Sequence, residues 1–263
     1  LNGYYGGTHL IKASIKKFGE YCREKGIKLN NKNFTIRYQT SIPRQVGLAG
    51  SSAIVTATMN ALMRFYKVDI PKPYLPSLIL STEVDELGIN AGLQDRVIQV
   101  YEGCVFMDFN KKHFQKHSHG KYEPLDHKLL PNLYLAYKTD LSKVSGKVFN
   151  DVKERYNQGD PTIVNTLTEI AELAEEGKKA LSDKDYAKLN YLIDNNFDLR
   201  SSIMNISETN RQLVTTARAC GASAKFSGSG GAIIGVYEDD EMLRRLMVHL
   251  KKINARVIKP FIT

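Results

Sequence analysis

Three short stretches of the sequence combine residue types that suit phosphate chemistry. The first runs Pro43-Arg-Gln-Val-Gly-Leu-Ala-Gly-Ser-Ser-Ala53. Small residues let backbone N–H groups approach phosphate oxygens closely, and a following helix adds its positive N-terminal end. Ser51 and Ser52 add hydroxyls for a phosphate or for Mg²⁺. The stretch contains no Gly-Lys-Ser/Thr and is not a Walker loop; a serine N-cap would explain one serine but not the whole run.

Two carboxylates follow this stretch at a separation of twelve residues, Glu83 and Asp95. Glu83 lies in an apolar segment that predicts a helix, and Asp95 follows Ala91-Gly-Leu-Gln near the start of another. Phosphoryl transfer needs a metal ion to neutralise the triphosphate and a group that orients or deprotonates the attacking hydroxyl. These carboxylates can meet both needs, although each, taken alone, is better explained as an ordinary helix charge.

The third stretch, Lys225-Phe-Ser-Gly-Ser-Gly-Gly231, lies between two apolar segments that predict strands. A hairpin turn needs only about two to four residues with one or two glycines. Three glycines and two serines in five positions also suit a loop that faces an anion or another backbone. The stretch by itself leaves the two interpretations open.

Apolar periodicity places these stretches on helices and strands of an α+β protein. We expect helices at 8–25, 51–66, 75–87, 92–101, 145–157, 162–182, 184–203, 206–220 and 239–253. We expect strands at 34–40, 104–109, 132–138, 222–226, 232–237 and 255–259. The polar, His- and Lys-rich stretch 110–131 predicts a loop and a domain boundary, giving domains 1–125 and 126–263.

The composition limits the classes of function. Hydrophobic residues make up 42% and charged residues 25%, as in soluble globular proteins, and no apolar run approaches the roughly 18 residues of a membrane helix. The net charge of +9 comes from scattered lysines, which favours a small anionic partner over nucleic acid. Three widely spaced cysteines predict a reducing, cytoplasmic setting. The histidines at 113, 117 and 119 lie in the polar stretch, which favours a loop over a metal site.

Taken in this order, the three stretches resemble the motifs of the GHMP kinase family, which includes galactokinase, homoserine kinase and mevalonate kinase. The resemblance implies ATP and Mg²⁺ as cofactors, Asp95 as the catalytic residue, and Glu83 with Ser52 as metal ligands. Gly47-Leu-Ala-Gly-Ser-Ser52 is one residue longer than the commonest form of the motif, so Ser51 stays an alternative ligand. The implied nucleotide- and phosphate-binding residues are Arg44, Gly47, Leu48, Ala49, Gly50, Ser51, Ser52, Ser227, Gly228, Ser229 and Gly230. Candidate substrate-binding residues are Tyr5, Arg96 and Lys225, with packing or a surface ion pair as the alternative for each.

The same resemblance implies a two-domain fold, with an N-terminal part similar to ribosomal S5 domain 2 and a ferredoxin-like C-terminal part. The family begins with a strand that bears a Gly-Arg-x-Asn-like first motif, and no such stretch precedes Pro43. Because Leu1 is not an initiator methionine, we expect that strand and part of the sugar pocket to lie upstream.

Several segments, among them Gly92-Leu-Gln-Asp-Arg-Val97, resemble the branch of the family that phosphorylates D-glucuronate at its anomeric hydroxyl. This implies a sugar or uronic acid as substrate, no nucleic-acid or membrane partner, and a monomer or homodimer. Two alternatives stay open. One is an anomeric kinase for another sugar of the fucose, heptose or galactose type, and the other is a non-catalytic sensor that binds sugar and nucleotide.

Overall fold

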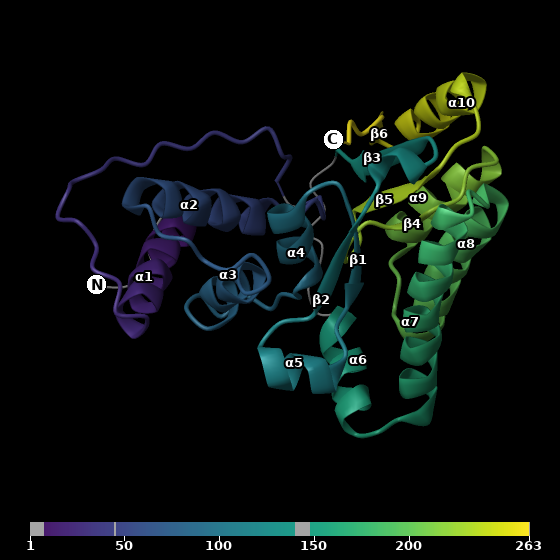
Figure 1. The fold of residues 1–263 in the computed structure, drawn as a ribbon. Coiled ribbons are helices and arrows are strands. Elements are labelled where there is room, and N and C mark those ends of the chain that lie inside the picture. Colours follow the sequence, from purple (N-terminus) through teal and green to yellow (C-terminus); the bar gives the residue numbers. More distant parts are fainter. Residues whose placement is uncertain (1–7, 45, 140–147, 263) are drawn as a thin grey trace. The chain divides into compact units, whose positions relative to one another are not determined.

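The computed structural model describes residues 8–44, 46–139 and 148–262, and the chain divides into two compact units (Figure 1). The first unit holds residues 1–42 and 49–125, and the second holds residues 43–48 and 126–263. The glycine-containing stretch at 43–53 therefore passes from the second unit into the first between Leu48 and Ala49.

Packed helices form the core of the first unit: α1 (His9–Glu24), α2 (Gly50–Tyr66), α3 (Leu75–Val84) and α4 (Gln94–Tyr101). Their apolar side chains recur at helical spacing, and Phe18, Met59 and Ile79 are buried in one shared cluster. Strands β1 (Cys104–Asp108) and β2 (Lys121–Leu125) pair antiparallel and are joined through α5 (Lys111–His117).

The second unit is built on a four-stranded antiparallel sheet in the order β4-β5-β3-β6. Its strands are β3 (Leu133–Lys138), β4 (Lys225–Phe226), β5 (Ala232–Val236) and β6 (Ala255–Ile258). A short 3-10 turn (His127–Leu129) precedes β3. Helices α6 (Val148–Asn157), α7 (Pro161–Ser182), α8 (Tyr186–Ile203) and α9 (Glu208–Ala219) connect β3 to β4, and α10 (Asp240–Lys251) connects β5 to β6. This strand order with two helical crossovers confirms the ferredoxin-like arrangement.

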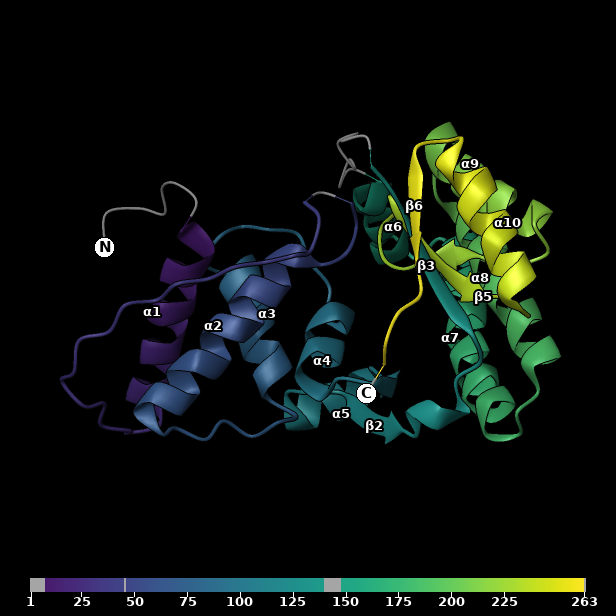
Figure 2. The ribbon, with the colours of Figure 1, turned by 90° about the horizontal axis from the view of Figure 1, so that it is seen from above.

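One face of this sheet is covered by helices, as the view in Figure 2 shows for α8, α9 and α10. Phe226 and Ile233 point into the core on that side, together with Leu213 of α9 and Leu246 of α10. Because side chains alternate along a strand, Lys225 and its cross-strand neighbour Ile234 point to the opposite face.

Two expectations about local structure are wrong. Residues 34–40 form no strand: they are mostly exposed and find no partner strand within the described part of the chain, and a strand requires a hydrogen-bonded neighbour. Residues 110–131 are not a single loop, because they contain α5 and β2. Within that stretch the rings of His113 and His117 stack, with their centroids 4.4 Å apart.

Candidate active site

The N-terminus of α2 carries the serine pair of the first motif. The helix begins at Gly50, and Ala49 before it has a left-handed backbone with φ of 52°. The first N–H groups of a helix have no partner within the helix, and the helix dipole makes this end positive. These properties suit the N-terminus of α2 to hold phosphate oxygens.

The two serines differ in their surroundings. Ser51 is exposed, and its hydroxyl donates to Oε1 of Glu83 on α3 at 2.9 Å. Ser52 is fully buried, and its hydroxyl donates to the carbonyl of Ala49 at 3.0 Å. Ser51 therefore presents its oxygen beside a carboxylate at the open end of the helix, whereas the hydroxyl of Ser52 stabilises the turn.

Glu83 forms a buried ion pair with Arg96 of α4. The carboxylate is fully buried, and its Oε2 accepts hydrogen bonds from Nε of Arg96 at 2.8 Å and from Nη2. Nη1 of Arg96 also donates to the carbonyl of Gly92 at 2.8 Å. A buried charge without a partner is costly. The positive charge and the hydrogen bonds of Arg96 therefore stabilise the carboxylate of Glu83 in its buried position next to Ser51.

Asp95 precedes Arg96 in the first turn of α4, and its side chain is 44% exposed. Its Oδ2 lies 3.4 Å from Nη1 of Arg96. Partial burial raises the pKa of Asp95 above its ordinary value, and the charge of Arg96 opposes this shift. A carboxylate with a raised pKa that stays open to solvent is suited to accept a proton.

In the second unit, Gly47 packs against the glycine loop at 227–231. Gly47 has φ of 78°, and a Cβ built on it would lie 2.1 Å from the carbonyl oxygen of Gly230. Val46 and Leu48 on either side pack with Tyr137 and Ala232 of the sheet. The two glycine-containing stretches, far apart in the sequence, therefore meet backbone to backbone.

The glycine loop itself is held from two helices. Gly231 N–H donates to Oδ1 of Asn210 on α9 at 2.9 Å, and the Gly228 carbonyl accepts from Nη2 of Arg200 on α8 at 3.0 Å. The N–H groups of residues 228–230 donate to no other group within the described ranges. Three successive free donors in a glycine loop are typical of an anion-binding site.

Two positive side chains adjoin this loop, Lys225 and Arg200. Among the residues that the structure describes, neither has a carboxylate partner. Burial, followed by the charge of Arg200, lowers the pKa of Lys225 to about 8. Because the charged forms of both side chains have no counter-ion within the described ranges, an anion bound here would stabilise them.

Comparison with known proteins shows which proteins this chain is similar to. Residues 9–103 match the family model described as GHMP kinases N terminal domain. Probable glucuronokinase 2 of Arabidopsis thaliana is 50% identical over 239 residues, which are 89% of this chain and 65% of that protein. Glucuronokinase 1 of the same plant is 48% identical over 237 residues, 88% of this chain and 65% of that protein. The chain is therefore similar to proteins of the GHMP kinase family.

The chain spans 65% of the length of the two plant relatives. Its fold is shared with Streptococcus pneumoniae phosphomevalonate kinase, a structure solved in complex with phosphomevalonate and AMPPNP. That match has a TM-score of 0.73 at 17% identity, and it covers 96% of this chain and 81% of the other.

The site residues predicted from the sequence fall into two groups. Ser51, Ser52, Glu83, Asp95 and Arg96 lie together in the first unit, with Ala49 and Gly50. In the second unit, Gly47, Leu48 and the loop 227–231 lie together, and Lys225 leads directly into that loop. Arg44 is exposed, and Tyr5 lies outside the described residues. The structural position of Arg96, buried on Glu83, favours a supporting role over substrate contact.

Sequence reasoning missed three residues that hold these motifs: Gln99, Arg200 and Asn210. Gln99 lies four residues after Asp95 and hence on the same side of α4, a spacing that points to it. Arg200 and Asn210 lie on helices with no motif, and only the fold brings them to the glycine loop.

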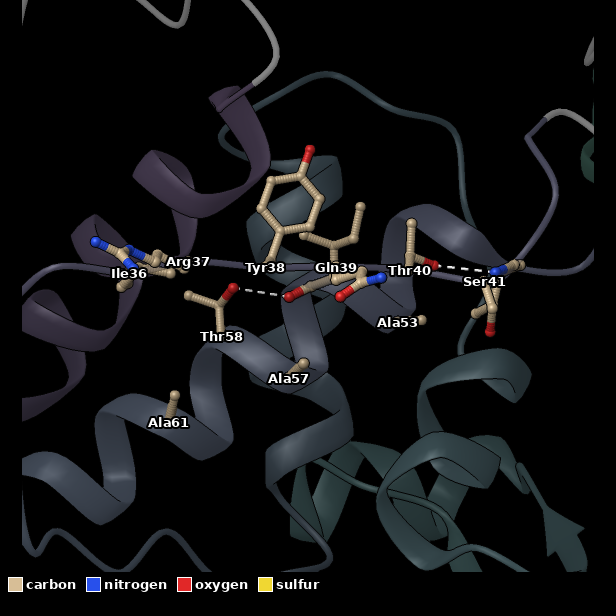
Figure 3. Close-up of a pocket in the computed structure, with 12 residues that line it drawn as sticks. Ile36, Arg37, Tyr38, Gln39, Thr40, Ser41, Ala53, Ala57, Thr58 and Ala61 are labelled. Atoms are coloured by element: carbon tan, nitrogen blue, oxygen red, sulfur yellow. Dashed lines mark hydrogen bonds between the residues drawn. The ribbon is translucent and has the colours of Figure 1, made fainter.

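An open groove with a cavity volume of about 350 Å³ lies elsewhere in the first unit (Figure 3). Residues 36–42 form one side, and Ala53, Ala57, Thr58 and Ala61 of α2 form the other. None of the predicted site residues lines it, so it has no part in the arrangement above. Within the described ranges no helix has the length and apolarity to cross a bilayer.

Proposed function

We propose that this chain carries the catalytic machinery of an ATP-dependent sugar kinase that phosphorylates the anomeric hydroxyl of D-glucuronate. The choice of glucuronate is supported by the names of the two plant relatives and their identities of 50% and 48%. The choice of a kinase is supported by the first unit, where a helix N-terminus, a hydroxyl and two carboxylates adjoin.

The hydrogen bond between Ser51 and Glu83 is the observation that carries the proposal. It puts two hard oxygen ligands side by side at the positive end of α2. Mg²⁺ prefers such ligands and completes its shell with water and substrate phosphates, so this donor set fits Mg²⁺. We assign the metal contact to Glu83 and Ser51, because the hydroxyl of Ser52 is buried on Ala49. When bound, the ion would neutralise charge on the triphosphate of ATP.

Asp95 is assigned the role of proton acceptor. As the anomeric oxygen of the sugar attacks the γ-phosphorus, the bond to ADP breaks and the hydroxyl proton passes to the carboxylate of Asp95. Its raised pKa suits this transfer, and Arg96 fixes the start of α4 through Glu83 and the Gly92 carbonyl.

The second unit is assigned the binding of anionic groups. The free N–H groups of residues 228–230, with Lys225 and Arg200, suit phosphate oxygens or the carboxylate of a uronic acid. Glucuronate is an anion in its own right, which agrees with two positive side chains that lack a carboxylate partner in the described part of the chain. A cytoplasmic location is part of the same proposal, in keeping with three free cysteines.

The test is a panel of sugars with MgATP, with ADP release and the sugar 1-phosphate measured by enzyme-coupled assay and ³¹P NMR. We expect the highest kcat/KM with D-glucuronate, lower values with galacturonate, and lower still with glucose, fucose and galactose. Asp95→Asn should lower kcat by about 10²-fold or more while nucleotide still binds. Wild-type protein that binds ATP but turns over no sugar would favour the sensor and contradict the proposal.

A further inference from the structure

Gln99 connects the helix that carries Asp95 to the N-terminus of α2. It lies on α4, one turn after Asp95. Its Nε2 donates to the Ala49 carbonyl at 3.2 Å and to Oγ of Ser52 at 3.0 Å. Its Oε1 accepts from Oγ1 of Thr56 at 3.1 Å. One amide therefore bonds three groups in the first two turns of α2.

The bond to Ala49 fixes the direction of a peptide group. In a trans peptide the C=O and the following N–H point in opposite directions. The Ala49 carbonyl is turned toward α4 and the helix interior, since Gln99, Ser52 and the N–H of Ala53 all donate to it. The N–H of Gly50 must then point away from α4, out of the helix end.

This orientation needs support because Ala49 is held in the left-handed region. A non-glycine residue there costs about 1 to 2 kcal/mol, so the peptide would otherwise tend to rotate. The bonds from Ser52 and from the N–H of Ala53 stay within α2 and its N-cap. Only the bond from Gln99, among those described, links Ala49 to another helix. The same helix α4 is linked to α3 through Arg96 and Glu83, so α4 ties together the groups assigned to phosphate, metal and proton.

We propose that Gln99 is a positioning residue, which orients the Ala49–Gly50 peptide so that its N–H faces a bound phosphate and keeps that peptide in register with Asp95. The inference rests on the proposed function, since it gives Gln99 a part in the same reaction. If Gln99 had a purely structural role, it would only provide hydrogen bonds to buried polar groups. One such group is the hydroxyl of Thr56, a residue that is 5% exposed.

The test compares two variants that each remove hydrogen bonds of the same amide. Gln99→Met keeps the length of the side chain but cannot donate to Ala49. Thr56→Val removes the bond on the other side of the amide and leaves both Nε2 bonds in place. The amide does not turn over in Thr56→Val, because Oε1 would then face the Ala49 carbonyl. Gln212→Met, on the exposed side of α9, is the matched control for the chemical change.

We expect Gln99→Met to raise the ATP KM and the nucleotide Kd about tenfold, with a smaller fall in kcat, as for the loss of one oriented donor. Gln99→Glu should behave in the same way, since its carboxylate cannot donate to a carbonyl. Thr56→Val and Gln212→Met should keep the wild-type KM. Urea unfolding of all four variants checks that they are folded.

Two results would overturn the inference: a wild-type ATP KM in folded Gln99→Met, or equal changes of KM in Gln99→Met and Thr56→Val. Both differ from failure of the proposed function, in which the wild-type protein itself phosphorylates no sugar. The nucleotide Kd gives a reading of the inference even in that case.

Discussion

The close approach of Gly47 and Gly230 makes Gly47→Ala the most informative substitution for the second unit. A Cβ at position 47 would lie 2.1 Å from the Gly230 carbonyl oxygen, whereas Cβ atoms essentially never approach a neighbour within 3.0 Å. The two backbones must therefore separate by about 1 Å, judged by ordinary packing contacts. The residue must also hold φ of 78°, which alanine disfavours.

These terms add to a measurable loss of stability. Left-handed alanine costs about 1 to 2 kcal/mol. Moving Gly230 weakens the bond from Gly231 N–H to Asn210, worth about 1 kcal/mol. The sum is about 2 to 3 kcal/mol, which for a urea m-value of about 2 to 3 kcal/mol/M lowers the unfolding midpoint of the second unit by about 1 M.

Two glycines in the same unit serve as controls. Gly177 lies inside α7 with no atom within 4 Å of its built Cβ, so Gly177→Ala should raise the free energy of unfolding by about 0.5 to 1 kcal/mol. A Cβ on Gly228 would lie 3.4 Å from the Gly47 carbonyl, and Gly228→Ala should be tolerated. If Gly47→Ala unfolds at the same urea concentration as wild type, the backbone contact between the two loops is refuted.

Further predictions concern the first unit and Lys225. Glu83→Gln should lower the free energy of unfolding by about 3 to 5 kcal/mol, because it leaves Arg96 buried without its partner; replacing both residues with leucine should restore most of that loss in the same urea assay. Ala49→Gly should raise thermal stability by about 1 kcal/mol, measured by calorimetry, since glycine accepts its φ of 52°; a lower melting temperature would contradict this. The pKa of Lys225 is about 8 in the folded protein, below the ordinary value of 10.5 that it regains on unfolding, so the unfolded chain binds more protons between these values. Wild-type stability should therefore rise more than that of Lys225→Met between pH 8 and 10, and equal rises would contradict the lowered pKa of Lys225.

The sequence predicted which residues lie together better than it predicted their exact contacts. Runs of glycine and serine, with carboxylates at a fixed spacing, depend on local residue types, and the structure brings Ser51 beside Glu83 and Gly47 beside Gly230. The choice between Ser51 and Ser52 needed the packing of α2 against α3, because only the structure shows that Ser51 faces Glu83 while Ser52 is buried on Ala49.

The wrong strand and the missed site residues have one physical cause: each depends on contacts between residues that are far apart in the sequence. Residues 34–40 alternate apolar and polar side chains as a strand does, but alternation supplies no hydrogen-bonding partner. Arg200 and Asn210 reach the glycine loop only because α8 and α9 pack on the same sheet. No local pattern in the sequence encodes such a meeting of distant helices.

The assignment of residues 43–48 to the second unit has a consequence for dissecting the protein. A truncated chain that ends at Leu125 would contain these six residues without the sheet on which Val46 and Leu48 pack. Conversely, a fragment beginning at Asp126 would expose the surface of Tyr137 and Ala232 that they cover. A chimera between this protein and a relative should therefore exchange residues 43–48 together with the residues after Leu125, because these two stretches belong to one unit.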